Sequence, residues 1–234
     1  MRKLTMVLCC MLSMPAYSCP LCNRQIREGI YNSQFYPNLF TMLLAFVVLT
    51  IIVIVLTAIS TARHRHKMQA HPQLILLSPV PLTTAGTVLG IGIGGFIDGI
   101  ILHQILQMHE MLSNKIPATD YIGKSINMFW DGIFHAFCLI VTIIGIILLW
   151  QVSKRSNADH SGRLLTAGLF LGWGIFNLVE GIIDHQILQL HNVIEYAHNH
   201  QPANYLFLGI SVVMILFGYM IIRSHHRSHH WPQV

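Results

Sequence analysis

The sequence predicts an all-α integral membrane protein with an N-terminal signal, one anchor span and then a four-helix transmembrane bundle. Three observations lead to this fold class. Of the 234 residues, 53% are hydrophobic and only 10% are charged, whereas soluble domains usually carry about 25% charged residues. Five long apolar segments follow one another along the chain. One 21-residue stretch occurs twice.

Residues 1–18 have the pattern of an export signal. Two basic residues precede an apolar run, and Ala16 and Ser18 put small side chains where signal peptidase prefers them. Acylation of Cys19, as in a lipoprotein, is the less favoured alternative, because Ala16 stands where such sites usually have leucine. In both cases the chain is expected to emerge outside the membrane at Cys19.

The next predicted unit, 19–67, combines an exported segment with the anchor span Leu39–Ser60. Cys19 and Cys22 form a Cys-X-X-Cys motif in the oxidising compartment, where such pairs usually become disulfides. The same spacing suits a redox pair or two ligands for a soft metal. A disulfide or redox role is favoured over a metal role.

Four further apolar segments form the predicted bundle domain, 82–223. Each is long enough to cross about 30 Å of hydrocarbon at about 1.5 Å per residue. They are Leu82–Gln107, Ile126–Gln151, Leu164–Leu190 and Tyr205–Arg223. A proline-containing cytoplasmic linker, 68–81, is expected before the domain, and a His-rich cytoplasmic tail, 224–234, after it.

The basic residues predict the orientation. One side of the predicted topology has only Arg24, Arg27, Lys115 and Lys124. The other side has Arg63, Arg65, Lys67, Lys154, Arg155, Arg163, Arg223 and Arg227. Because the richer side is normally cytoplasmic, we expect a multi-pass protein of the bacterial inner (cytoplasmic) membrane. Its N-terminus would lie outside after signal cleavage and its C-terminus in the cytoplasm. The net charge of +5 then reflects topology, and nucleic acid is not an expected partner.

The repeated stretch is Leu89–His109 and Leu171–His191. At an offset of 82 residues, 13 of the 21 positions are identical. The matched ionisable pairs are Asp98 with Glu180, His103 with His185, and His109 with His191. Both copies run in the same direction, so we expect two parallel two-helix repeats about a pseudo-twofold axis along the membrane normal. Matching polar positions predict one site built from two halves.

Ionisable side chains are costly inside a bilayer, at roughly 2.5–3.5 kcal/mol near its centre. Asp98 and Glu180 are expected roughly 10 Å below the outer surface, and Asp131 roughly 8 Å. At about 100° per residue, His103 and His185 would stand about 140° from the carboxylates of their own helices. Each would then face a neighbouring helix or complete a wider site. Pairing that only holds the helices together is the plainer alternative, but the number of groups in one layer favours a functional site.

Histidine and carboxylate side chains together suit a divalent transition metal: zinc, iron, manganese or copper. A two-metal site is a further option, as in helix bundles that hold two irons. The candidate ligands are Asp98, His103, Asp131, His135, Glu180, Asp184, His185, His109 and His191. The candidates for orienting those ligands from behind are Gln104, Gln107, Asn177, Gln186 and Gln189.

Three segments, 95–104, 131–135 and 177–185, resemble an uncharacterised bacterial family known as domain of unknown function twenty-two forty-three. The resemblance covers about residues 80–223. It implies a membrane location and a four-span core, and it implies no activity. The exported segment and the anchor span lie outside the resemblance, so the chain is expected to be a fusion.

The leading functional hypothesis is a metal-binding membrane protein that handles or inserts metal for an envelope metalloenzyme or electron-transfer protein. Cys19 and Cys22 would then deliver or reduce the metal. The alternative is a membrane-embedded metal-dependent enzyme, either a hydrolase or a di-iron oxidase. A proton or ion pathway is less favoured, because the cytoplasmic halves of the bundle spans contain almost no polar groups. The sequence predicts the lipid bilayer as surroundings and no particular oligomeric state.

Overall fold

The structure is a computed structural model that describes residues 23–70 and 77–228. The predicted signal segment, Cys19 and Cys22 lie outside the described residues, as do part of the linker and the end of the tail. The described chain is helical apart from its loops and an isolated bridge between Ser78 and Ala158. That bridge ties the segment before one central helix to the loop before the other.

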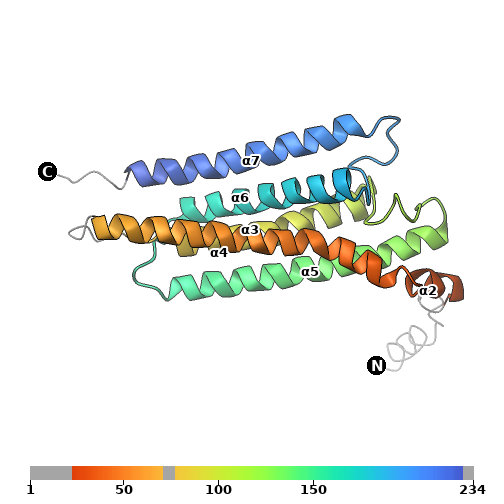
Figure 1. Cartoon of the computed structure of the whole chain (residues 1–234), viewed down its shortest axis with the longest axis horizontal. Helices are drawn as coiled ribbons and strands as arrows, with labels where there is room; N and C mark the ends of the chain where they lie inside the picture. The colour runs from red at the N-terminus through yellow and green to blue at the C-terminus, as the bar shows by residue number, and fades with distance from the viewer. Residues whose placement is uncertain (1–22, 71–76, 229–234) are drawn as a thin grey trace, which may run out of the picture.

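Among the described residues, five helices are long and apolar enough to cross a membrane, and they correspond to the five apolar segments of the sequence. A short helix, α2 (Arg24–Ile30), precedes them. The long elements are α3 (Phe35–Ala70), α4 (Val80–Ile97) running into η2 (Asp98–Ile105), α5 (Tyr121–Ser153), α6 (Gly162–Glu180) running into η3 (Gly181–Ile187), and α7 (Gln201–Ser228). They lie roughly along one direction, with α2 at one end (Figure 1).

Helix α3 is longer than the sequence predicted. It continues beyond Ser60, through the basic stretch that includes Arg63 and Lys67, and ends at Ala70. This stretch contains no proline or glycine before Pro72, so nothing in the backbone interrupts the helix earlier. The basic residues therefore stand on helical turns rather than in a linker.

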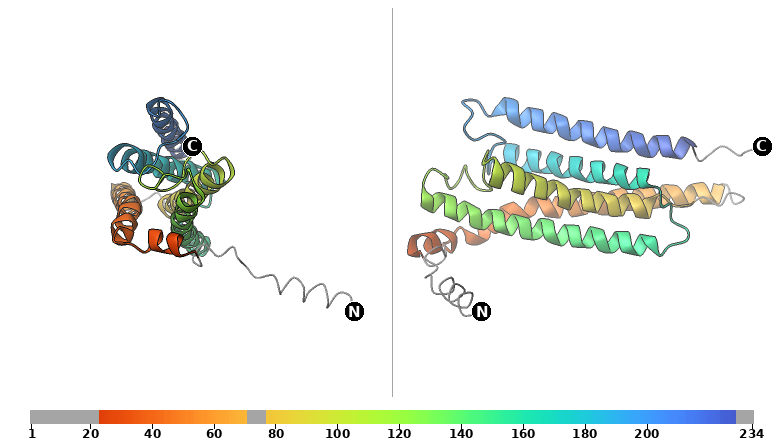
Figure 2. Two further views of the ribbon diagram at one scale, coloured as in Figure 1. Left: turned by 90° about the vertical axis from the view of Figure 1, so that its right-hand side faces the viewer. Right: turned by 180° about the vertical axis from the view of Figure 1, so that it is seen from behind.

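Helices α4 and α6 form the centre of the bundle, with α5 packed on α4 and α7 packed on α6 (Figure 2). Glycines let the two central backbones meet. A Cβ atom at Gly86 would come within 3.1 Å of the Gly168 backbone, one at Gly90 would meet Leu169, and one at Gly172 would meet Thr87. Small residues at four-residue spacing allow such an approach between membrane helices. Gly86 and Gly168 are themselves 82 residues apart.

The two long loops, 106–120 and 188–200, lie at the same end of the bundle (Figure 1). A fully buried asparagine anchors each of them. Asn127 accepts a hydrogen bond from the Leu112 backbone N–H at 3.0 Å and donates one to the Ile116 carbonyl at 2.7 Å. Asn204 accepts one from the Val193 backbone N–H at 3.0 Å. The loops are therefore fixed to the helices beneath them.

Candidate metal centre

Both central helices change from α- to π-geometry where the ionisable groups begin. A π-helix pairs residue i with residue i+5, and such turns often occur at functional sites. The Leu106 N–H accordingly bonds the Ile101 carbonyl at 2.8 Å, and the Leu188 N–H bonds the Ile183 carbonyl at 2.7 Å. These two bonds are 82 residues apart.

The π-geometry brings Asp98 and His103 together, with 3.0 Å between the carboxylate Oδ2 and the imidazole Nε2. Regular α-helical spacing had placed these residues about 140° apart. The wider turn of η2 corrects that expectation, because five residues of a π-helix return the chain to nearly the same face. His103 therefore belongs to the same site as the carboxylate of its own helix.

His109 and His191 lie beyond the helix ends, which come earlier than the sequence predicted. In each copy one glutamine has a positive φ, 50° at Gln107 and 49° at Gln189. This left-handed conformation is uncommon for a residue with a side chain. It occurs at matched positions two residues before each histidine. Both histidines are buried beneath the loops, with exposed fractions of 2% and 0%.

Each of these two histidines is held by the other copy's loop. The Nδ1 of His109 donates to the Val193 carbonyl at 3.0 Å, and the Nδ1 of His191 donates to the Met111 carbonyl at 3.0 Å. The carbonyl can only accept, so Nδ1 carries the proton and Nε2 keeps its lone pair. Neither Nε2 has a hydrogen-bond partner within the described residues. This is the usual way in which a protein orients a histidine that binds metal.

His103 is fixed in a comparable way by a carboxylate. Its Nδ1 donates to Oδ1 of Asp131 at 2.9 Å. Asp131 also accepts from the Met111 backbone N–H at 3.0 Å and, through Oδ2, from the Gln104 side chain at 2.9 Å. Asp131 thus orients His103 and the start of the loop, and Nε2 of His103 faces the cluster.

Three imidazole nitrogens converge as a result. One nitrogen each from His103, His109 and His191 lies within 4.8 Å of the others, and the same holds for ligand atoms of Glu180, His185 and His191. Two atoms bound to one ion at about 2.0–2.1 Å stand roughly 3–3.4 Å apart. The 3.0 Å between Asp98 and His103 has that separation already. The other atoms need small movements to reach it.

Two carboxylates complete the cluster from opposite copies. Oδ1 of Asp98 lies 3.8 Å from Nε2 of His109, and Oε1 of Glu180 lies 3.9 Å from Nε2 of His191. The exposed fractions of Asp98 and Glu180 are 4% and 1%, and neither oxygen of Glu180 has a hydrogen-bond partner among the described residues. Buried charges are normally paired or bound to metal.

Burial also sets the charge of the two loop histidines. Burial together with the neighbouring His103 lowers the pKa of His109 to about 3. Burial together with His185 and His109 holds the pKa of His191 well below its usual range. Both imidazoles are therefore neutral near pH 7, which is the form that binds metal.

The remaining predicted ligands differ in position. Both ring nitrogens of His185 and Oδ1 of Asp184 are buried without a hydrogen-bond partner among the described residues. Only His185 belongs to one of the two converging groups. His135 lies apart, stacked on Phe96 with ring centroids 6.1 Å apart and in contact with Gly99. Asp131 faces His103 instead of His135.

Of the residues predicted to orient the ligands, some contact the cluster and others do not. Gln104 supports Asp131, whereas Gln107 accepts from Lys124 and Gln186 donates to Gln201 at 3.5 Å. Asn177 is buried, and its Oδ1 has no partner in the described part of the chain. The sequence analysis missed the orienting groups Met111 and Val193, because they act through backbone carbonyls.

A polar pocket of about 290 Å³ is lined by residues of the two long loops and by His185. Its lining includes Asn114 and Gln189, together with His198 and His200. Nδ1 of His200 donates to the Ile194 carbonyl at 2.8 Å. Of the residues in the two converging groups, the pocket reaches His185.

The fold and this cluster define a multi-pass membrane protein with buried histidine and acidic groups that could hold a metal. The family described as "Predicted membrane protein (DUF2243)" matches residues 85–225, and the chain belongs to it. The matched range begins within α4, so α2 and α3 lie outside it. Neither a curated protein nor a solved structure matches the chain.

Proposed function

We propose that this chain is a membrane metalloprotein that binds a divalent transition metal between its two central helices. One observation carries the proposal. His103, His109 and His191 each have Nδ1 held by a hydrogen bond and a second nitrogen that converges with the other two inside a buried cluster. Interhelical pairing alone would leave no reason for the unpartnered Nε2 atoms of His109 and His191 to face His103 inside one buried cluster.

The donor set supports zinc, iron, manganese or copper. Imidazole suits zinc, copper and iron, and carboxylates widen the range to manganese. In our proposal His103, His109 and His191 bind the ion with Asp98, while Asp131 orients His103. His135 is left out of the ligand set, because it faces Phe96.

The 82-residue offset supports a site made of two halves. Asp98, His103 and His109 form one half, and Glu180, His185 and His191 form the other. The hydrogen bonds of His109 and His191, the π-helices and the positive φ values all recur at this offset. Either the two halves share one ion or each half holds its own ion. The number of metal ions bound per chain distinguishes these two arrangements.

The charge pattern supports an extracytoplasmic site in the inner membrane. The cluster lies at the end of the bundle opposite to Arg63, Arg163 and Arg223, and the side rich in basic residues is normally cytoplasmic. The pocket at His185 would then admit metal from outside. Cys19 and Cys22, if exported, would lie on the same side and would deliver or reduce the metal before it is passed to an envelope metalloenzyme or electron-transfer protein.

A membrane-embedded metal-dependent enzyme is the second candidate. The burial of the cluster favours an ion that stays in place, and the pocket of about 290 Å³ beside His185 offers room for a small substrate. Exchange of bound metal separates the two roles. A metal-handling protein should release its ion within minutes to a metal-free acceptor or a chelator, whereas an enzyme should retain it.

The test of metal binding is elemental analysis of the purified protein, as isolated and after loading with each of the four metals. We expect about one or two ions per chain in the wild type. If the halves share one ion, His109→Ala and His191→Ala should each lower the metal content at least tenfold. If each half holds its own ion, each variant should lose about one of the two ions. The matched control His135→Ala should leave the metal content unchanged. A wild type that holds none of the four metals, or variants that bind as well as the wild type, would sink the proposal.

A further inference from the structure

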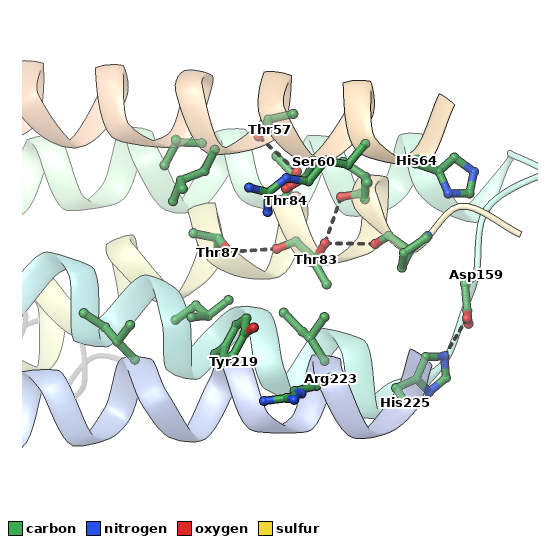
Figure 3. Close-up of a pocket in the computed structure, with 18 of the residues that line it drawn as sticks. Thr57, Ser60, His64, Thr83, Thr84, Thr87, Asp159, Tyr219, Arg223 and His225 are labelled. Atoms are coloured by element: carbon green, nitrogen blue, oxygen red, sulfur yellow. Dashed lines mark hydrogen bonds and ion pairs between the residues drawn. The ribbon is translucent and has the colours of Figure 1, made fainter. Parts of the chain in front are cut away.

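A second cavity lies at the end of the bundle opposite to the histidine cluster. Its volume is about 1220 Å³, which exceeds the roughly 300–1,000 Å³ of sites for drug-sized ligands. It lies between α3 and α7, with α4 and α6 forming its floor. In Figure 3, Thr57, Ser60 and His64 stand on the α3 side, and Tyr219 and Arg223 on the α7 side.

The length of the cavity matches one leaflet of a bilayer. Its lining on α3 runs from Val53 to Lys67, a distance of about 21 Å at 1.5 Å per residue. Half of a bilayer with its headgroup region is about 20–22 Å thick. An extended acyl chain that enters at the cavity mouth would thus be covered along most of its length.

The walls of the cavity are mainly apolar. Leu56, Leu171, Ile175 and Ile215 line its inner part. The threonine hydroxyls are already bonded: Thr57 and Thr84 bridge α3 and α4 at 3.1 Å, and Thr87 donates to the Thr83 carbonyl at 2.8 Å (Figure 3). The interior therefore suits hydrocarbon and offers few free hydrogen-bonding groups.

The mouth of the cavity is cationic. Arg63, Lys67 and Arg223 line it, and all three are exposed. None of them forms an ion pair with a carboxylate in the part of the chain that the structure describes. Asp159 is the acidic lining residue, and its Oδ2 lies 2.7 Å from Nε2 of His225. Three positive charges thus surround an apolar space at the membrane surface.

From this charge and shape we infer that the cavity binds an anionic glycerophospholipid, with its phosphate among Arg63, Lys67 and Arg223 and an acyl chain between α3 and α7. Basic pockets between transmembrane helices on the cytoplasmic side are suited to anionic lipid headgroups. A neutral amphiphile would gain nothing from the three cations. The bound lipid would join α3 to α7 where few direct contacts do so.

Native mass spectrometry of the full-length protein in detergent tests this inference. The probes are phosphatidylglycerol and phosphatidylcholine. We expect the wild type to retain about one anionic lipid and to prefer phosphatidylglycerol. Each basic side chain strengthens such binding roughly fivefold at low ionic strength, so R63Q/K67Q/R223Q should bind phosphatidylglycerol on the order of 100-fold more weakly.

The matched control removes three cations from the same end without touching the cavity. Lys154, Arg155 and Arg163 do not line it, so K154Q/R155Q/R163Q should bind lipid like the wild type. Ser60→Phe narrows the cavity and leaves its three cations in place. We expect it to weaken lipid binding at least tenfold. It therefore tests the inference independently if R63Q/K67Q/R223Q fails to fold. Equal binding of both lipids, retention of a neutral amphiphile, or equal losses in the control would overturn the inference. The metal site lies at the other end of the bundle, so the lipid-binding variants should keep a normal metal content. Failure of lipid binding can therefore be distinguished from failure of the proposed metal site.

Discussion

The imidazole rings of His109 and His191 lie face to face, with centroids 4.7 Å apart and planes 4° from parallel. Each ring is fixed by the loop of the other copy, through the carbonyls of Val193 and Met111. The two loops are thereby locked across the molecule, and neither histidine can be placed by its own segment alone. A metal site at this position depends on both copies together.

The carboxylate of Asp131 should strengthen metal binding without touching the metal. Asp131→Asn keeps the shape of the side chain but removes the charge that holds Nδ1–H of His103. Loss of such an orienting group typically lowers metal affinity 10–100-fold. We expect a loss of this size in a chelator competition assay. Asp120→Asn, at the N-cap of α5, serves as the control and should bind metal normally.

Because η2 is a π-helix, the histidine must stand five residues after Asp98, and not four, to meet its carboxylate. In a regular α-helix, residue 102 would stand over Asp98, whereas in the π-helix His103 does so. Exchanging the two side chains, with Leu102→His and His103→Leu together, should lower metal content as far as His103→Leu alone. Elemental analysis measures this. Recovery of metal in the exchanged variant would mean that the segment is an ordinary α-helix.

Much of the fold could be predicted from the lengths of the apolar segments. The candidate ligand residues could be predicted from the repeated stretch. The five spans could be predicted because uninterrupted apolar runs of this length have few other uses. Asp98, His103, Glu180 and His185 could be selected because they are ionisable and recur at one offset. Their five-residue spacing in both copies was the available signal for a π-turn.

The side-chain directions in the cluster could not be predicted from the sequence. Asp131 and His135 stand four residues apart, which favours a shared site on an α-helix, yet Asp131 turns to His103 and the Met111 backbone. The hydrogen bonds that orient His109 and His191 end on backbone carbonyls, which leave no mark in a sequence. The turn at Gln107 is also invisible, because glutamine does not favour positive φ.

The buried side chain of Asn127 should support both the loop and the metal. It bonds the Leu112 N–H and the Ile116 and Gly123 carbonyls. Asn127→Ala leaves the Leu112 N–H and the Ile116 carbonyl without this partner, and a buried unpaired group costs about 1–3 kcal/mol. We expect a lower unfolding temperature in detergent and weaker metal binding, since Leu112 adjoins the Met111 carbonyl. A variant with unchanged metal affinity would show that the loop keeps its position without Asn127.

The glycine contact between α4 and α6 should control stability of the bundle. Gly90→Ala would drive a methyl group into the Leu169 backbone, and Gly172→Ala would drive one into Thr87. A backbone cannot move aside as a flexible side chain can, so each change should destabilise the fold by about 1–3 kcal/mol. The measurement is thermal unfolding in detergent.

The neighbouring helices α5 and α7 supply matched controls for this prediction. A Cβ atom at Gly132 or Gly209 meets no heavy atom within 4 Å, and both residues are exposed. Gly132→Ala and Gly209→Ala should therefore leave stability unchanged or raise it by up to about 1 kcal/mol, because alanine favours the helix. Metal content should fall in Gly90→Ala and Gly172→Ala, since both halves of the cluster stand on the helices that these glycines bring together. Equal stability in all four variants would mean that α4 and α6 do not meet as closely as the structure has them.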